Sequence, residues 1–165
     1  MILMARADDR LVHGMVGWAW TQLLKPETIL VANDETANDS FKNMTIKLAK
    51  PAGVNLVIKT IEDSIKALNN PINDKRRIFL VTESVEDAYK IFQQVTGITK
   101  MNISTAGVNR KPNEEYIATL PMVFMTKKEF EYAELMNAAG VEVFAQTTPI
   151  KDRMEFPEIV KKFSK

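Results

Sequence analysis

Short apolar runs alternate along this chain with longer segments in which apolar residues recur every three or four positions. The runs are nearly continuous, which is typical of strands that are covered on both faces. Their alternation with helical segments favours βαβ units and a mostly parallel sheet. We predict strands at residues 2–7, 28–32, 54–59, 77–81, 101–103, 122–125 and 141–144.

Helices are predicted between and after these strands. Ser84 is an expected N-cap, and Thr126 with Glu129 forms an expected capping box. Trp18 and Trp20 lie two apart on the first helix, so they face different ways and one is expected in the core. The predicted helices are 12–23, 41–48, 61–68, 85–92, 127–140 and 152–163. In the second of these, Phe41, Met44 and Leu48 lie on one face, and Asn38 or Asp39 is the expected N-cap.

The length and composition indicate one globular domain. A chain of 165 residues supplies one hydrophobic core, and no linker or repeat divides it, so we predict a single domain over residues 1–165. Apolar residues make up 45% and charged residues 26%, which is ordinary for such a domain. We therefore expect an α/β fold with an open, mostly parallel sheet of about seven strands and helices on both faces.

Charge and cysteine content exclude several kinds of function. The formal net charge of +1 gives no basic field that would recruit nucleic acid or an acidic membrane. The chain has no cysteine, which excludes disulfides, thiolate metal sites and thiol nucleophiles, and suits a cytosolic protein. No stretch approaches the ~20 consecutive apolar residues of a membrane span, and the apolar start meets charged residues too soon for a signal peptide.

The one histidine of the chain, His13, lies where the first predicted strand turns into the first helix. In α/β sheets, ligands bind beyond the carboxyl ends of the strands. A neutral imidazole can accept a phosphoryl group, Arg10 offers a planar fork for phosphate oxygens, and Gly14 at a helix N-terminus lets an anion approach the backbone. Asp8 or Asp9 could orient the second ring nitrogen or cap the helix. Phosphoryl chemistry is the resulting hypothesis.

Other readings of these features stay open. A lone histidine also serves as a capping or partly buried structural residue. Asp34 and Asn38 follow the second strand and would either line the same crevice or simply form a loop and cap. Ser104 and Thr105 follow the fifth strand and offer hydroxyls, as phosphate loops do, although neither a P-loop nor a G-x-G-x-x-G pattern is present.

The histidine loop and three further segments resemble the IIB component of the mannose-type sugar phosphotransferase system. The resemblance extends over nearly the whole chain. The matching segments are Asp8-Asp9-Arg10-Leu11-Val12-His13-Gly14, Asn33-Asp34-Glu35-x-Ala37-Asn38-Asp39, the turn Pro51-x-Gly53-Val54, and Gly140-Val141-Glu142-Val143 leading to Gln146 and Pro149.

The resemblance implies an open α/β sheet and a phosphocarrier. His13 would accept a phosphoryl group, at Nδ1, from a phosphohistidine of a IIA partner and pass it to a sugar translocated by IIC and IID membrane subunits. Arg10 would bind the phosphate, Asp8, Asp9 and Gly14 would be loop residues, and Asp34 and Asn38 would lie in neighbouring loops. The protein would be cytoplasmic and peripheral to the permease, with no cofactor, metal or nucleic acid, and a homodimer is allowed.

The chain departs from the family pattern in two places. Met15 stands where the family usually has glutamine after His-Gly, so a contact to the phosphorylated state is expected to be missing. The loop after the fifth strand is usually glycine-rich, and here Ser104 and Thr105 replace glycines, so its phosphate contacts are expected to differ.

Two rival functions come from other classes. A receiver-like signalling module would be phosphorylated on aspartate, with Asp8 and Asp9 as its acidic pair, but its candidate acceptor Asp34 follows the second strand rather than the third. A non-catalytic ligand-binding domain is the other alternative. The chemical stability of the bound phosphate distinguishes the three functions, because phosphohistidine is acid-labile, an acyl phosphate reacts with hydroxylamine, and a pure binder carries no phosphate.

Overall fold

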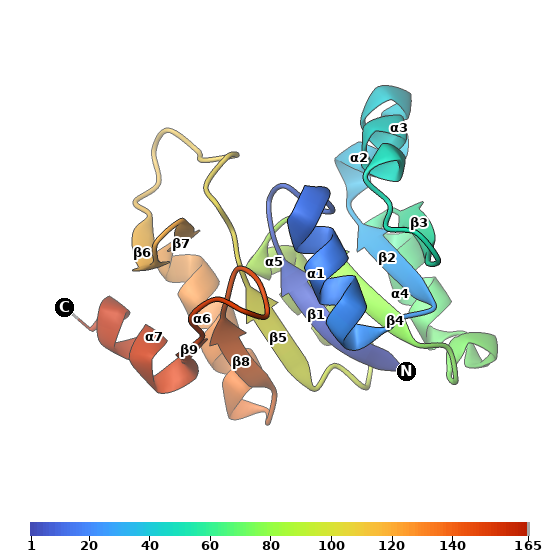
Figure 1. Cartoon of the computed structure of the whole chain (residues 1–165). Helices are drawn as coiled ribbons and strands as arrows, with labels where there is room; N and C mark the ends of the chain where they lie inside the picture. Colours follow the sequence, from blue (N-terminus) through green and yellow to red (C-terminus); the bar gives the residue numbers. More distant parts are fainter. Residues whose placement is uncertain (165) are drawn as a thin grey trace.

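Most strands of the protein form one parallel sheet. The computed structural model describes residues 1–164, without the side chain of Met15. In this part of the chain the main sheet has seven strands in the order β3-β2-β4-β1-β5-β8-β9, and only the edge strand β9 is antiparallel (Figure 1). The strands are β1 (Ile2–Ala7), β2 (Thr28–Ala32), β3 (Asn55–Lys59), β4 (Ile78–Thr82), β5 (Lys100–Ile103), β8 (Glu142–Ala145) and β9 (Met154–Glu155).

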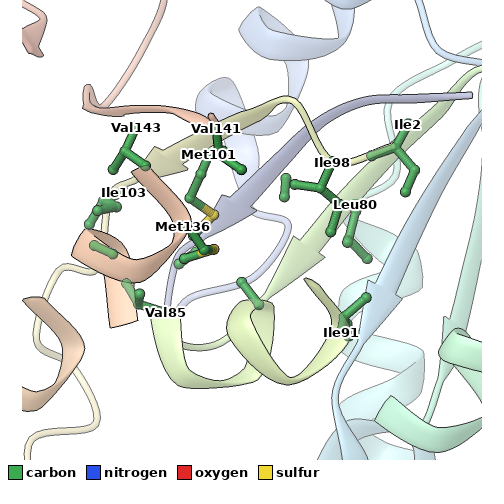
Figure 2. Packing of buried hydrophobic residues seen from close by; sticks show 14 of the residues in the cluster. Ile2, Leu80, Val85, Ile91, Ile98, Met101, Ile103, Met136, Val141 and Val143 are labelled. Atoms are coloured by element: carbon green, nitrogen blue, oxygen red, sulfur yellow. The ribbon is translucent and has the colours of Figure 1, made fainter. Parts of the chain in front are cut away.

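Helices cover both faces of this sheet, as the apolar runs predict. The helices are α1 (Gly14–Leu24), α2 (Asp34–Asn38), α3 (Ser40–Leu48), α4 (Ile61–Asn69), α5 (Val85–Phe92), α6 (Lys127–Ala138) and α7 (Phe156–Phe163), with a short 3-10 turn at Pro71–Asn73. On one face, α4, α5, α6 and α7 pack over a core that includes Leu80, Met101 and Met136 (Figure 2). On the other face, α1 and the end of α3 pack over Met4, Ile29 and Phe79.

Helix caps follow the sequence closely. The Ser84 hydroxyl accepts a hydrogen bond from the Asp87 amide at 3.1 Å, and Thr126 with Glu129 forms the expected capping box. Trp20 is buried and Trp18 is half exposed, so the two tryptophans face different ways as predicted. Among the described residues, no helix has both the length and the apolar character that crossing a bilayer requires.

The strand prediction at 122–125 is correct in its position and wrong in its partner. β7 (Val123–Met125) does not join the main sheet, but pairs antiparallel with β6 (Ile117–Leu120), which the pattern does not predict. The seventh place in the main sheet is taken by β9, whose two residues are too few to show a period. Apolar patterning indicates that a segment is buried and does not specify the strand with which it pairs.

The apolar stripe predicted along the second helix points outward. α3 begins after Asp39, which caps it as expected, but Phe41, Met44 and Leu48 are 72%, 56% and 83% exposed. Ile46 packs instead against the core beneath α1. The surface of α3 is therefore unusually apolar.

Candidate functional site at the β1–α1 turn

The turn between β1 and α1 lies at a topological switch point of the sheet. β1 and β5 are neighbours, but the chain leaves β1 towards β2 through α1 and leaves β5 towards β8 (Figure 1). Connections that diverge in this way open a crevice at the carboxyl ends of the two strands. Residues 8–13 occupy this position, as the sequence predicts.

His13 is the N-cap residue of α1, in extended conformation with φ −150° and ψ 136°. Its side chain makes no capping hydrogen bond, and no acidic residue occupies the first turn of α1. The first amide N–H groups of the helix therefore remain available to an anion, which the helix dipole also attracts. Gly14 opens the helix with φ +36°, and no described atom lies within 4 Å of where its Cβ would be. A phosphate-sized ligand can thus come close to the backbone here.

The imidazole of His13 is half-buried and asymmetric in its contacts. Nδ1 lies 3.3 Å from the Leu11 carbonyl oxygen, whereas Nε2 is buried and has no hydrogen-bond partner in the described part of the chain. Burial lowers the pKa of His13 below its usual value, Asp8 opposes that shift, and Arg10 adds to it. The ring is therefore neutral at pH 7 and carries a lone pair, which is the form that acts as a nucleophile.

Asp8 holds the guanidinium of Arg10 rather than the imidazole. Its carboxylate is completely buried and accepts from the Arg10 amide at 3.0 Å, from Arg10 Nε at 2.9 Å and from Arg10 Nη2 at 3.0 Å. A fourth donor, Arg6 Nη2, lies 2.9 Å away. These donors fill the lone pairs that a carboxylate offers, so Asp8 is a fixed anchor.

The guanidinium of Arg10 keeps N–H donors that Asp8 does not bind. Its side chain is 29% exposed, and only Nε and Nη2 are engaged with Asp8. A guanidinium has five N–H donors, so Nη1 and the second hydrogen of Nη2 form a free fork at the far end of the group. Such a fork matches two oxygens of a phosphoryl group.

Asp9 does not have the role expected for it. Its carboxylate oxygens accept hydrogen bonds from the amides of Ala106 at 2.7 Å and Asn109 at 3.2 Å, on the loop after β5. Among the described residues, the Asp9 carboxylate forms no hydrogen bond with the imidazole or with an amide of α1, so neither expected contact is present in this structure. Asp9 instead ties the histidine turn to the neighbouring loop.

The hydroxyls of the loop after β5 differ in their availability. Ser104 is fully buried, and its Oγ has no partner among the described residues. The Thr105 hydroxyl donates to the Phe124 carbonyl of β7, so it is engaged in holding the small hairpin. Only Ser104 of the two keeps an unused hydroxyl, and the side chain of Met15, the other departure from the family pattern, lies outside the described residues.

Asp34 and Asn38 lie on α2 and are both exposed. The Asp34 carboxylate accepts from the Ile61 amide at 2.8 Å, and the Asn38 side chain donates to the Asp34 carbonyl at 2.9 Å. Within residues 1–164, no hydrogen bond joins either of them to the His13 turn. Asp34 and Asn38 therefore form hydrogen bonds within and beside α2, and the structure does not bring them to the histidine.

Two clefts open on this edge of the sheet. One, of about 260 Å³, lies beside Arg10 and Leu11 and reaches α3 at Phe41. The other, of about 300 Å³, lies between Asp9, α5, α6 and the loop after β5, and its lining carries more carboxylates than lysines. Burial raises the pKa of Glu129 in the second cleft, where its oxygens accept from the amides of Thr126 and Val85. Only the first cleft borders the arginine of the histidine turn.

Sequence reasoning missed one charged residue of the site. Arg6 lies within β1, is only 2% exposed, and contacts Asp8, Asn102 of β5 and the carbonyl of Gln146. Burial lowers the pKa of Arg6 to about 10 although Asp8 opposes the shift, so the guanidinium stays charged at neutral pH. The available signal was a lone arginine inside an otherwise apolar strand run.

Comparison with known proteins agrees with the geometry. A family model described as the PTS system sorbose subfamily IIB component matches residues 2–165. A probable phosphotransferase enzyme IIB component of Streptococcus pyogenes is 35% identical over 162 residues, covering 97% of this chain and 99% of that protein. The mannose-specific EIIAB component of Escherichia coli is 25% identical over 165 residues, and this chain spans 50% of its length.

Solved structures show the same fold. The IIBSor domain of the sorbose permease of Klebsiella pneumoniae superposes with a TM-score of 0.86 at 20% identity, covering 98% of this chain and 97% of that domain. The manxB structure of Thermoanaerobacter tengcongensis gives a TM-score of 0.85 at 25% identity, covering 99% of this chain and 96% of that one. The fold, the family match over nearly all residues and the end-to-end relative together show that the chain belongs to the sorbose-subfamily, mannose-type IIB components of the sugar phosphotransferase system.

Proposed function

We propose that this protein is a phosphocarrier that takes a phosphoryl group from a phosphohistidine of a IIA partner onto His13. It then passes the group to a sugar translocated by IIC and IID membrane subunits, from the cytoplasmic side. The observation that carries the proposal is a neutral imidazole at an uncapped helix N-terminus, beside an arginine with a free fork. The name EIIAB of the E. coli relative supports a IIA partner, since that chain is twice as long as the IIB part matched here.

The step is a displacement between two imidazoles. The lone pair of a His13 nitrogen attacks phosphorus, the N–P bond of the donor breaks, and its electron pair returns to the donor ring. We place the new bond at Nδ1, because Nε2 is buried. In the contact with the Leu11 carbonyl, Nδ1 is the donor, so the ring has to change tautomer before attack. The contact opens, Nδ1 releases its proton to solvent, and a proton is taken up on Nε2, which leaves the lone pair on Nδ1.

Positioning and electrostatics supply most of the catalysis in such a transfer. The charge that spreads over the phosphoryl oxygens would meet the free fork of Arg10 and the first amides of α1. Asp8 fixes the guanidinium from behind, which lowers the entropy lost when the phosphoryl group is bound.

The receiver-like alternative loses its support from the same contacts. A receiver phosphorylated on aspartate uses an acidic pair to hold Mg²⁺. Here the Asp8 carboxylate is paired with Arg6 and Arg10, and the Asp9 carboxylate is bound by two loop amides. Asp8 has no lone pair left for a cation, so the two carboxylates do not form the acidic pair that would hold Mg²⁺.

The test is incubation with phosphoenolpyruvate, the general phosphotransferase proteins and a matched IIA protein, followed by mapping of the label. We expect one acid-labile, alkali-stable phosphate on His13 and none on the His13→Ala variant. Nitrogen-detected NMR of the phosphorylated protein should place the phosphate at Nδ1. A hydroxylamine-sensitive label would show an acyl phosphate, and an unlabelled protein would show a pure binder; either result contradicts the proposal.

A further inference from the structure

Arg6 is a buried cation that the proposed phosphoryl transfer does not touch directly. It lies in β1, one strand from each of β4 and β5, and is 2% exposed. Its Nη2 donates to Asp8, its Nη1 donates to Asn102 Oδ1, and Nη1 also lies 3.2 Å from the Gln146 carbonyl oxygen. The guanidinium also lies 5.5 Å from the ring centre of Trp20, whose indole N–H donates to the Thr147 carbonyl at 2.9 Å. The group is fully enclosed.

Enclosing a guanidinium is expensive, so its presence needs a reason. Removing a charge from water costs several kcal/mol, and a buried ion pair often contributes little to stability compared with apolar residues of similar volume. Asp8 does not need Arg6 as a partner, because Arg10 already forms a bidentate ion pair with it through Nε and Nη2 and donates its backbone amide as well. Stability therefore gives no clear ground for a second arginine here.

The net charge of the turn gives a reason for the second arginine. The charges of Asp8 and Arg10 alone would cancel, and an arginine that its own carboxylate neutralises attracts a phosphoryl group weakly. With Arg6 on the far side of the same carboxylate, the three groups carry one net positive charge. Because Arg6 is enclosed and Arg10 is partly exposed, the part of this charge that a ligand can reach is on Arg10.

We propose that Arg6 is a positioning residue for phosphoryl transfer: it neutralises Asp8 from the buried side, so that Asp8 holds the Arg10 fork in place without cancelling its charge. This inference rests on the proposed function of His13. Asn102 and the Gln146 carbonyl hold Arg6 in the plane that reaches Asp8, and the Asn102 amide also donates to that carbonyl at 3.1 Å. The residues behind the phosphate-binding arginine thus come from β1, β5 and the end of β8.

The test compares Arg6→Met with the double variant Arg6→Met/Asp8→Asn. Methionine has a similar length and no charge, so Asp8 would cancel the charge of Arg10. The rate of phosphoryl acceptance should then fall about 10- to 100-fold, by analogy with the loss seen when the partner that orients a metal-bound side chain is removed. The double variant removes both charges and leaves Arg10 uncancelled. It should react faster than Arg6→Met and within about tenfold of the wild-type rate. The KM for the phosphorylated IIA donor should change little in either variant, since the docking surface is untouched.

Two further variants keep the outcome decisive. Arg6→Lys retains the charge without the fork, and it should stay within about fivefold of the wild-type rate if charge is what matters. Arg153→Met is the matched control, because Arg153 pairs with Glu142 and Glu155 at the far edge of the sheet and should leave the rate unchanged. If Arg6→Met does not fold, the double variant decides, since removing both partners of a buried pair costs less than removing one.

The two proposals fail in different ways. If the wild-type protein acquires no phosphate on His13, the proposed function is wrong. If the wild-type protein is phosphorylated on His13 but folded Arg6→Met reacts at the wild-type rate, the role of Arg6 is wrong. The role is also wrong if the folded double variant is as slow as Arg6→Met or more than about tenfold slower than wild type.

Discussion

Replacing Arg10 with alanine is expected to slow phosphoryl acceptance by His13 about 10²- to 10³-fold. The magnitude follows from the donors that the structure leaves free. Nε and one N–H of Nη2 are engaged with Asp8, which leaves three N–H groups, and two of these form the outward fork that can bind the phosphoryl oxygens. Hydrogen bonds to charged groups contribute about 1.5–3 kcal/mol each. Because the side chain is 29% exposed, we take the lower end, which gives about 3 kcal/mol and agrees with the loss of one electrostatic donor in other enzymes.

The assay is rapid-quench transfer from a labelled phosphorylated IIA donor at saturating concentration. Arg10→Lys keeps the charge and loses the fork, so it should fall between wild type and Arg10→Ala. Arg153→Ala, in an exposed ion-pair cluster away from the turn, is the control and should react normally.

Loss of folding has to be separated from loss of chemistry. Without the Arg10 side chain, the buried Asp8 keeps only Arg6 and one backbone amide as donors, so the melting temperature should also fall. Rates are therefore compared well below the melting temperature of each variant. A folded Arg10→Ala protein that accepts phosphate within threefold of the wild-type rate would refute the placement of the guanidinium on the phosphoryl group.

Three further outcomes are expected. Because the pKa of His13 is lowered in the folded state, the rate of phosphoryl acceptance should be constant above pH ~6.5 and fall only at lower pH. As the pH falls below ~6.5, the unfolded chain takes up the His13 proton before the folded protein does, so the free energy of unfolding should decrease. Urea titrations should find this decrease smaller in His13→Ala. Thr126→Ala removes the capping-box hydroxyl and should lower the free energy of unfolding by about 1 kcal/mol in urea. Ile91→Ala, at a fully buried position, should cost about 2–5 kcal/mol, whereas Leu48→Ala, 83% exposed, should stay within about 0.5 kcal/mol; equal effects would contradict the core assignment.

Sequence patterning predicted the elements of the parallel sheet well because each central strand is buried on both faces. The bounds of β1 and β2 coincide with the prediction, since their apolar runs end at charged or polar residues. β6 and β9 were missed because one carries mixed burial and the other has two residues. The outward face of α3 could not be foreseen either, because a helical period shows that one face is apolar and does not show whether another element covers it.

The site was predictable only as far as local sequence reaches. His13, Arg10 and Gly14 are neighbours in the chain, so their meeting at one turn followed from the strand-to-helix transition. Asp9 is bound by amides of the loop after β5, 97 and 100 residues further along, and a single sequence does not specify such a distant partner. Asp8 is bound by Arg6 and Arg10, each two residues away, and the sequence pattern does not show that these arginines rather than His13 face its carboxylate. The charged Arg6 inside an apolar run was visible, but its purpose depends on how close it lies to Asp8.

The long-range hydrogen bonds that hold the histidine turn have a consequence for the order in which this part of the chain folds during synthesis. The anchor of Asp9 at Ala106 is 97 residues further along, and the carbonyl that holds Arg6 is 140 residues further along. His13 therefore leaves the ribosome long before the residues that hold its turn exist, and contacts of such wide separation make folding slow. A nascent chain that stops before Gln146 would carry the whole histidine loop in sequence and still lack the carbonyl that holds Arg6 behind it.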